Sequence, residues 1–291
     1  MDICTTKAAI RARVRDWRAA GRHVVLVPTM GYLHAGHMAL VARAREDAGP
    51  EGRVIASIFV NPTQFGPTED LATYPRDPAR DTGMLEAAGV DAVFIPEVSE
   101  VYAPGAQTIV ETTELAGILI GKLRPGHFRG VATVVTKLFN IVQPDTACFG
   151  EKDYQQLAVI RTMARDLDMP VRVIGVPTVR DPDGLAMSSR NVRLTPEDRA
   201  AAPVLNAALT EAETLARDGV TASRLRSHVR ARLEAEPRAD VQSVDIRDAE
   251  TLAALSGPLT RPAVLLLAVR FGAVLLIDNR VVGPESKEET P

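Results

Sequence analysis

The alternation of short apolar runs with helical patterns constrains this chain more than any other feature of its sequence. Apolar runs of strand length occupy residues 24–28, 54–60, 92–95, 146–149 and 171–176, and helical patterns at 38–44, 77–88, 131–142 and 154–167 lie between them. Strands that alternate with helices predict a doubly wound parallel sheet, because each helix carries the chain back to begin the next parallel strand. We therefore expect a Rossmann-like α/β domain, which binds ligands at the carboxyl ends of its strands.

The alternating pattern ends near residues 181–184. Thr195 followed by Pro196 is typical of a helix start, and this helix is expected to run to about Gly219. A second helix is predicted at 221–236, and strands are predicted at 241–246, 263–271 and 273–278, the last two as a hairpin. The sequence thus predicts a Rossmann-like domain over 1–184, a small α+β lid domain over 185–291, and a frayed, charged tail from 283 to 291.

Charge and cysteine content limit the class of partner. The formal net charge of −3 argues against a broad basic surface for nucleic acid. Cys4 and Cys148 offer neither a disulfide framework nor a zinc-binding spacing. The longest apolar stretch, 263–277, is interrupted by Arg270 and is too short to cross a membrane, and residues 1–22 lack the apolar core of a signal peptide. We expect a cytoplasmic protein that binds neither nucleic acid nor membrane.

The most specific motif is the segment 28–37, PTMGYLHAGH, between the first predicted strand and the first predicted helix. Gly31 and Gly36 allow a sharp turn and a close approach of the backbone to a ligand. His34 and His37 lie at a helix start, where free N–H groups and the helix dipole favour phosphate, and both can donate to phosphate oxygens. The structural alternative is a pair of capping histidines in a surface loop. The pairing with two glycines favours a role in breaking a phosphoanhydride.

Two further segments follow predicted strands. In FGEKDYQQ, residues 149–156, Lys152 is a mobile cation suited to phosphate and Asp153 could accept from ribose hydroxyls, although an ordinary helix start would look similar. In FVNPTQF, residues 59–65, Gln64 can hydrogen-bond a hydroxy acid without carrying charge, although a structural turn is equally compatible with the spacing.

The segment DGLAMSSRN, residues 183–191, lies where the alternating pattern ends. The hydroxyls of Ser188 and Ser189 followed by the guanidinium of Arg190 can grip phosphate, and Gly184 offers a hinge. A solvated interdomain linker is the alternative. If the segment binds phosphate, we expect the second domain to close over the ligands and exclude water from a reactive intermediate.

These segments, in this order, resemble the pantoate–β-alanine ligase family, a branch of the nucleotidyltransferase superfamily that carries the His-x-Gly-His signature. The resemblance includes RPGHFRG at 124–130 and extends from about Val24 to Leu194. It implies adenylation of pantoate by ATP, then attack by β-alanine with release of AMP and pyrophosphate. It also implies Mg²⁺ with the triphosphate, for which Asp81 is a weak candidate ligand, and a homodimer.

The resemblance assigns catalytic roles to His37, His34 and Lys152, and places pantoate or β-alanine against Gln64 and Gln156. The implied ATP contacts are Met30, Gly31, Tyr32, Leu33, His34, Ala35, Gly36, His37, Gly150, Glu151, Lys152, Asp153, Val179, Met187, Ser188, Ser189 and Arg190. The alternative within enzymes is a nucleotidyltransferase acting on another small acceptor, although the neutral Gln64 and Gln156 disfavour a phosphorylated one. The net negative charge and the lack of a candidate anticodon-binding module disfavour a tRNA synthetase. A non-catalytic nucleotide-binding regulator would not need both His37 and Lys152.

Overall fold

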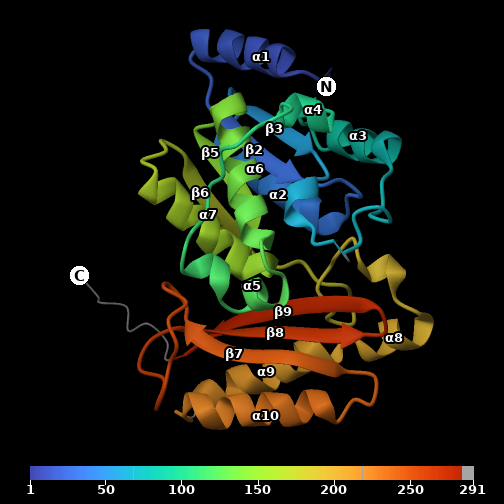
Figure 1. Cartoon of the computed structure of the whole chain (residues 1–291), viewed down its shortest axis with the longest axis vertical. Helices are drawn as coiled ribbons and strands as arrows, with labels where there is room; N and C mark the ends of the chain where they lie inside the picture. The colour runs from blue at the N-terminus through green and yellow to red at the C-terminus, as the bar shows by residue number, and fades with distance from the viewer. Residues whose placement is uncertain (68, 218, 284–291) are drawn as a thin grey trace. The chain divides into compact units, whose positions relative to one another are not determined.

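The computed structural model describes residues 1–67, 69–217 and 219–283 (Figure 1). The chain forms two compact units, the first comprising residues 1–151 and 155–179, the second comprising residues 152–154 and 180–291. The division therefore falls between Val179 and Arg180, slightly before the expected position, and the short segment Lys152–Tyr154 is counted with the second unit. In the described ranges, no helix is both long and apolar enough to cross a membrane.

A six-stranded sheet organises the first unit, and every pairing in it is parallel. Its strands, in spatial order, are β1 (Asp2–Cys4), β4 (Ala92–Phe94), β3 (Arg53–Ile58), β2 (Val24–Thr29), β5 (Thr146–Gly150) and β6 (Arg172–Val176). This confirms the predicted doubly wound α/β class. The edge strand β1 was not predicted, because three residues are too few to show a period of two.

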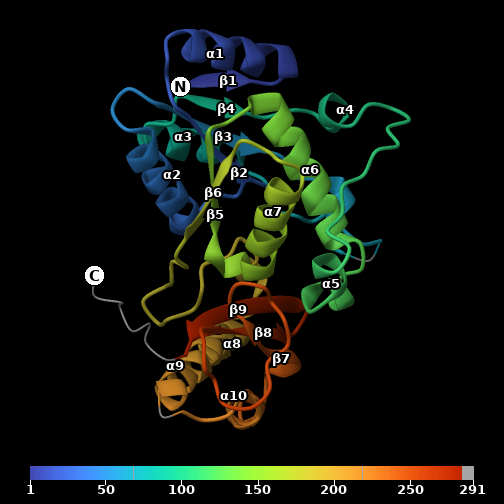
Figure 2. The ribbon, with the colours of Figure 1, turned by 90° about the vertical axis from the view of Figure 1, so that its left-hand side faces the viewer.

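Helices cover both faces of this sheet. One face carries α2 (Ala35–Ala48) and α3 (Pro78–Ala87), and the other carries α6 (His127–Val142) and α7 (Tyr154–Asp166), as Figure 2 shows, with α1 (Lys7–Ala19) beside α6. Strand side chains alternate accordingly: Val25 and Val27 pack with α2, whereas Val24 and Leu26 pack in the cluster that contains α6. Shorter turns in this unit are η1 (Pro62–Gln64), α4 (Val98–Val101), η2 (Leu115–Gly117), α5 (Ile120–Leu123) and η3 (Glu151–Asp153).

The strand order reverses direction between β2 and β5. From β2 the chain crosses through α2 to β3 on one side, and from β5 it crosses through α7 to β6 on the other. Diverging connections leave a crevice outside the carboxyl ends of the two central strands, which is where doubly wound sheets bind ligands. The loops that leave Thr29 and Gly150 therefore both begin at the switch point of the sheet.

The second unit is a small α+β structure. Its antiparallel sheet has the order β7 (Asp240–Asp248), β8 (Ala263–Phe271), β9 (Val274–Val282), and its helices are α8 (Pro196–Ala201), α9 (Val204–Arg217) and α10 (Ala222–Glu234), preceded by η4 (Asn191–Arg193). The helices α9 and α10 pack on each other and against the sheet (Figure 1). The predicted β8–β9 hairpin is confirmed, and β9 is longer than expected because its pairing with β8 extends from Val274 to Val282.

One prediction in the second unit was wrong. The helix expected to run from Pro196 to about Gly219 ends at Ala201 and a new helix begins at Val204. Pro203 lies at this break, because proline has no N–H to donate within a helix and disfavours helical backbone in the residue before it. The tail expected to fray from 283 onward lies, apart from Gly283, outside the described residues.

Candidate active site

One buried carboxylate holds the loop after β2 in place. Asp81, on α3 and 1% exposed, accepts a hydrogen bond from the backbone N–H of Tyr32 at 2.7 Å and another from that of Leu33 at 2.8 Å. These two bonds hold Tyr32 in a left-handed conformation, with φ of 51°. Gly31 also has a positive φ of 83°, and a Cβ there would lie 3.0 Å from Asp81 Oδ2. The tight turn therefore requires glycine at 31 and a short acid at 81.

Asp81 therefore has a structural role in the loop. Both of its oxygens are committed to backbone donors, and its side chain is closed off from solvent. That it is also a weak magnesium ligand stays a prediction. Within the described ranges, no group of three or more His, Cys, Asp or Glu side chains could hold a metal ion.

His34 and His37 form a reciprocal cap on α2. The Nδ1 atom of His34 accepts from the N–H of Gly36 at 3.2 Å, and the Nδ1 atom of His37 accepts from the N–H of His34 at 3.3 Å. Because Nδ1 is the acceptor in each ring, the neutral imidazole carries its proton on Nε2. The ring centroids are 4.1 Å apart. The capping and functional interpretations are therefore compatible, since capping fixes both rings with Nε2 as a donor.

This cap changes which groups of the loop could meet a phosphate. The N–H groups of Gly31, Tyr32, Leu33, His34, Gly36 and His37 all donate to partners within the loop or to Asp81. The free backbone donors expected at the helix start are thus largely occupied, and the imidazole N–H groups take their place. Leu33 is fully buried, whereas Ala35 is exposed and His34 and His37 are half-buried.

Gln64 is held from two sides at the end of η1. Its Oε1 accepts from Asn61 Nδ2 at 3.0 Å, and its Nε2 lies 3.2 Å from the sulfur of Met30. Asn61, 1% exposed, also donates from Nδ2 to the carbonyl of Gly130 on α6 at 3.1 Å and accepts from Tyr102 Oη at 2.9 Å. Gln64 is itself buried. The side chain predicted to contact the hydroxy acid is therefore preorganised, and Asn61 is a positioning residue that sequence analysis did not identify.

The start of α6 holds the backbone of Gln64. The carbonyl of Gln64 lies 2.9 Å from Nδ1 of His127 and 3.4 Å from Nη2 of Arg124. Arg124 forms a two-pronged ion pair with Glu69, with Nε to Oε1 at 3.0 Å. Burial alone would raise the pKa of the Glu69 carboxyl, but the hydrogen bonds and positive charge of Arg124 hold this pKa below its ordinary value.

Two adjacent glutamines at the start of α7 have different surroundings. Gln155 is buried and structural, since its amide donates to the carbonyls of Leu115 at 2.9 Å and Ile118 at 2.8 Å and accepts from the N–H of Ile120 at 3.1 Å. Gln156 is half-buried, and within the described chain its amide has no hydrogen-bond partner. Of the pair, Gln156 is the one whose amide is not committed to the 115–120 loop, and its predicted contact with pantoate stays a prediction.

In the second unit, a side chain of β9 forms a hydrogen bond with the backbone of Lys152. Asn279 Nδ2 donates to the carbonyl of Lys152 at 2.8 Å, and Tyr154 Oη donates to the carbonyl of Ala249 at 2.6 Å. The ammonium of Lys152 lies 3.9 Å from Asp153 Oδ1, so these two predicted ATP contacts are paired with each other. Gly150 and Glu151 precede this segment at the end of β5, and no atom lies within 4 Å of a Cβ built at Gly150.

The segment after Val179 forms a closed turn. The backbones of Arg180 and Ala186 pair in an isolated antiparallel β-bridge. Between them, Gly184 has a φ of 92°, and a Cβ at this residue would lie 2.4 Å from Asn206 Nδ2. Glycine at 184 is thus favoured by the turn, and a hinge at this residue stays a prediction. Beyond the turn, Ser188 Oγ accepts from the N–H of Arg190 at 3.2 Å, and Met187, Ser188, Ser189 and Arg190 are all half-buried.

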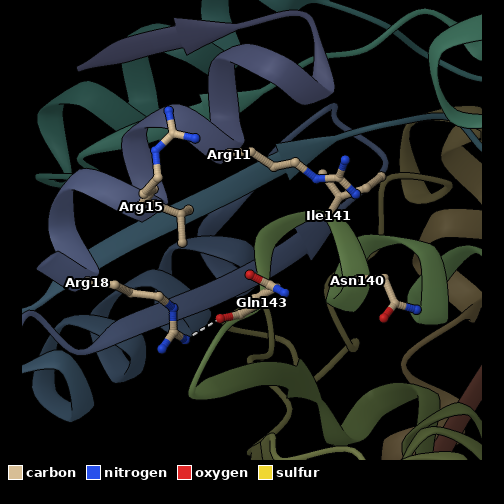
Figure 3. Close-up of a pocket in the computed structure, with 7 residues that line it drawn as sticks. Arg11, Arg15, Arg18, Asn140, Ile141 and Gln143 are labelled. Atoms are coloured by element: carbon tan, nitrogen blue, oxygen red, sulfur yellow. Dashed lines mark hydrogen bonds between the residues drawn. The ribbon is translucent and has the colours of Figure 1, made fainter.

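A hollow of about 430 Å³ in the first unit lies at the other end of α6 from His127 (Figure 3). Arg11, Arg15 and Arg18 of α1 line it together with Asn140 and Gln143. Arg18 donates to the carbonyl of Gln143 and pairs with Asp145 at 3.0 Å, so it satisfies the carboxyl end of α6. No predicted site residue lies in this hollow.

The parallel sheet and the imidazole pair beside its switch point define an α/β protein of the nucleotide-binding class. The family model described as pantoate-beta-alanine ligase matches residues 2–281. The chain is 54% identical to the pantothenate synthetase of Sinorhizobium medicae over 287 residues, which is 98% of each chain. It is 51% identical to that of Agrobacterium fabrum, over 99% of this chain and 98% of the relative. The chain belongs to the pantoate–β-alanine ligase family.

Solved structures agree with this assignment. The pantothenate synthetase of Thermus thermophilus superposes with a TM-score of 0.92 at 48% identity, covering 98% of this chain and all of that one. The pantoate-beta-alanine ligase of Francisella tularensis, crystallised with β,γ ATP and β-alanine, gives a TM-score of 0.79 at 33% identity, with 97% of each chain covered.

Proposed function

We propose that this protein condenses pantoate with β-alanine at the expense of ATP, through a pantoyl adenylate. The observation that carries the proposal is the pair of imidazoles at the switch point of the sheet, each locked with Nε2 as the donor. Donors preorganised in this way stabilise charge that develops on phosphate oxygens without having to reorient during the reaction.

In the first step, the pantoate carboxylate attacks the α-phosphorus of ATP. A bond forms between the carboxylate oxygen and phosphorus, the bond to the bridging oxygen breaks, and pyrophosphate leaves. His34 and His37 donate to the oxygens on which charge accumulates, and Lys152, Ser188, Ser189 and Arg190 supply further donors. The triphosphate would carry Mg²⁺, which neutralises its charge and would be held mainly by the phosphates and water.

In the second step, the neutral amine of β-alanine attacks the acyl carbonyl and AMP leaves. The amine loses one proton as the amide forms, so ATP, pantoate and β-alanine yield pantothenate, AMP, pyrophosphate and a proton. No dedicated base for this proton is assigned. Orientation of the two reactants supplies most of the rate advantage, since holding two groups in place replaces an encounter in solution.

Pantoate is assigned to Gln64 and Gln156. Neutral amides suit a hydroxy acid because they can both donate to its oxygens and accept from its hydroxyls. Gln64→Ala and Gln156→Ala should each raise the KM for pantoate and leave the affinity for ATP nearly intact. Gln155→Ala is the matched control for a structural effect, because Gln155 is committed to the 115–120 loop. Calorimetry that showed an equal loss of ATP affinity in the Gln64 variant would contradict the assignment.

The exchange of labelled pyrophosphate into ATP tests the adenylate directly. Pantoate alone should support this exchange, whereas β-alanine alone should not. Stoichiometric ADP and phosphate in the overall reaction would overturn the adenylate route. Exchange that required a different small acceptor would indicate a nucleotidyltransferase of another specificity.

We further propose a homodimer, on the resemblance to the family, and a cytoplasmic location. The two cysteines are both buried and unpaired, which suits a reducing compartment. Sedimentation at micromolar concentration tests the dimer, and a single species at the monomer mass of 31.3 kDa would refute it.

A further inference from the structure

We propose that His127, locked by Arg124 into the tautomer that donates from Nδ1, is a positioning residue that orients Gln64 for pantoate. The proposal rests on the assignment of pantoate to Gln64. It concerns a histidine that sequence analysis left without a role, 8% exposed in the first turn of α6.

The tautomer follows from the chemistry of arginine. Arg124 Nη1 lies 3.2 Å from Nε2 of His127, and a guanidinium can only donate. Nε2 must therefore accept, which places the ring proton on Nδ1. Nδ1 then donates to the carbonyl of Gln64 at 2.9 Å. Arg124 is in turn fixed by its two-pronged pair with Glu69, so the chain of contacts runs from a carboxylate through a guanidinium and an imidazole to one carbonyl.

The carbonyl of Gln64 is a position with few alternative supports. The residue ends a short 3-10 turn, and its Cα and N pack directly against Gly130, one helical turn after His127. Its side-chain amide is oriented by Asn61 and lies beside Met30. Without the 2.9 Å bond from His127, only the longer contact of 3.4 Å from Arg124 Nη2 holds this carbonyl. Rotation about the backbone of residue 64 would then carry the amide away from the direction that Asn61 and Met30 define.

Asparagine and glutamine separate the two nitrogen positions of the ring. The amide of an asparagine at 127 occupies the place of Nδ1 and can still donate to the Gln64 carbonyl. The amide of a glutamine occupies the place of Nε2, so it can contact Arg124 but not donate to that carbonyl. The two variants are matched in polarity and differ in whether residue 127 can donate a hydrogen bond to the Gln64 carbonyl.

His127→Asn should keep the KM for pantoate within about 2-fold of wild type, whereas His127→Gln should raise it about 3- to 10-fold, the range expected for one lost hydrogen bond. The KM for ATP should be unchanged in both. In a Gln64→Ala background, His127→Gln should have no further effect on pantoate, because the amide to be oriented is absent. Thermal midpoints measured in parallel show whether any difference reflects stability alone.

Equal effects of the two variants on pantoate, or parallel changes in the KM for both substrates, would overturn the proposal. If Gln64→Ala itself left pantoate use intact, the assignment of Gln64 would fail instead, so the two failures are distinguishable. Should His127→Gln not fold, Arg124→Lys provides the second test. It retains the charge but loses the fork that fixes the tautomer, and it should raise the pantoate KM by a few-fold. An unchanged pantoate KM in that variant would refute the tautomer lock.

Discussion

Gly130→Ala is the substitution whose effect the structure defines most sharply. A Cβ at Gly130 would lie 2.4 Å from the carbonyl oxygen of Thr63 and 2.6 Å from both the Cα and the N of Gln64. Ordinary van der Waals contact begins at 3.4 Å, so η1 must retreat by about 3.4 − 2.4 = 1.0 Å. All three obstructing atoms are backbone, which cannot be moved by a change of rotamer. The retreat also strains the bond from Asn61 to the Gly130 carbonyl.

Two energies oppose each other in this variant. Overpacking costs about 1–3 kcal/mol, whereas alanine in a helix interior gains about 1 kcal/mol over glycine. The expected net loss of stability is therefore at most about 2 kcal/mol. The functional loss should be larger, because a displacement of about 1 Å in a positioning group can cost about 10²-fold in rate. We expect kcat/KM for pantoate to fall by about that factor.

Gly83→Ala is the matched control. Gly83 is also helical, lies exposed on α3, and has no atom within 4 Å of a built Cβ. The Gly83→Ala variant should be more stable by up to about 1 kcal/mol, and its kcat/KM for pantoate should be unchanged. Pyrophosphate exchange with titrated pantoate measures kcat/KM for pantoate, and thermal denaturation measures stability. Wild-type kinetics in Gly130→Ala, or an equal loss in Gly83→Ala, would refute the reasoning.

Three further predictions follow from the site and the core. His37→Ala should lower kcat by ~10²–10³-fold, and Lys152→Ala should act similarly on adenylation; near-wild-type kcat in single-turnover experiments would return either residue to a structural role. Asp81→Asn should cost about 1–3 kcal/mol in urea unfolding, because Tyr32 and Leu33 each donate to a different carboxylate oxygen and the amide replaces one of these oxygens by an NH2 group that cannot accept; an unchanged midpoint would contradict this. Burial raises the pKa of the Cys148 thiol from 9.0 to about 11. Between these two pH values the thiol is neutral in the folded protein, whereas the same thiol is ionised in the unfolded chain. Its contribution to stability is therefore complete below pH 9 and is lost as pH rises towards about 11, and Cys148→Ala should flatten this fall in urea midpoints measured across the window.

Local sequence signals located most of the first unit correctly. The apolar runs at β2, β3, β4 and β5 are buried almost throughout, so they appear in the sequence as continuous hydrophobic stretches that need no tertiary information. The edge strand β6 is only partly buried, and its apolar run was still long enough to be recognised. The break between α8 and α9 was missed although Pro203 marks it in the sequence, since the helix-start signal at Thr195 and Pro196 was extended through it.

The motifs predicted which residues carry chemistry but not how each one is held. The spacing of His34 and His37 indicates a nucleotide site, yet only the observed cap shows that both rings are fixed with Nε2 as the donor. The structural role of Asp81 was not predicted, because nothing in the sequence reveals that Tyr32 and Leu33, far away along the chain, present their N–H groups to it. Adjacent Gln155 and Gln156 are chemically identical in the sequence, and their different roles follow from which one faces the 115–120 loop.

The sequence by itself determined the α/β class, the two-part organisation of the pattern and the residues that could meet a nucleotide and a hydroxy acid. These features depend on periodicity and residue type, which are local properties of the chain. The tertiary structure alone decided that β2 and β5 lie side by side at the switch point, that α6 presses on η1 at Gly130, and that Arg124 sets the tautomer of His127. Each of these involves groups well separated in sequence or a hydrogen-bond geometry that spacing does not encode, so they exist only once the core has brought the segments together.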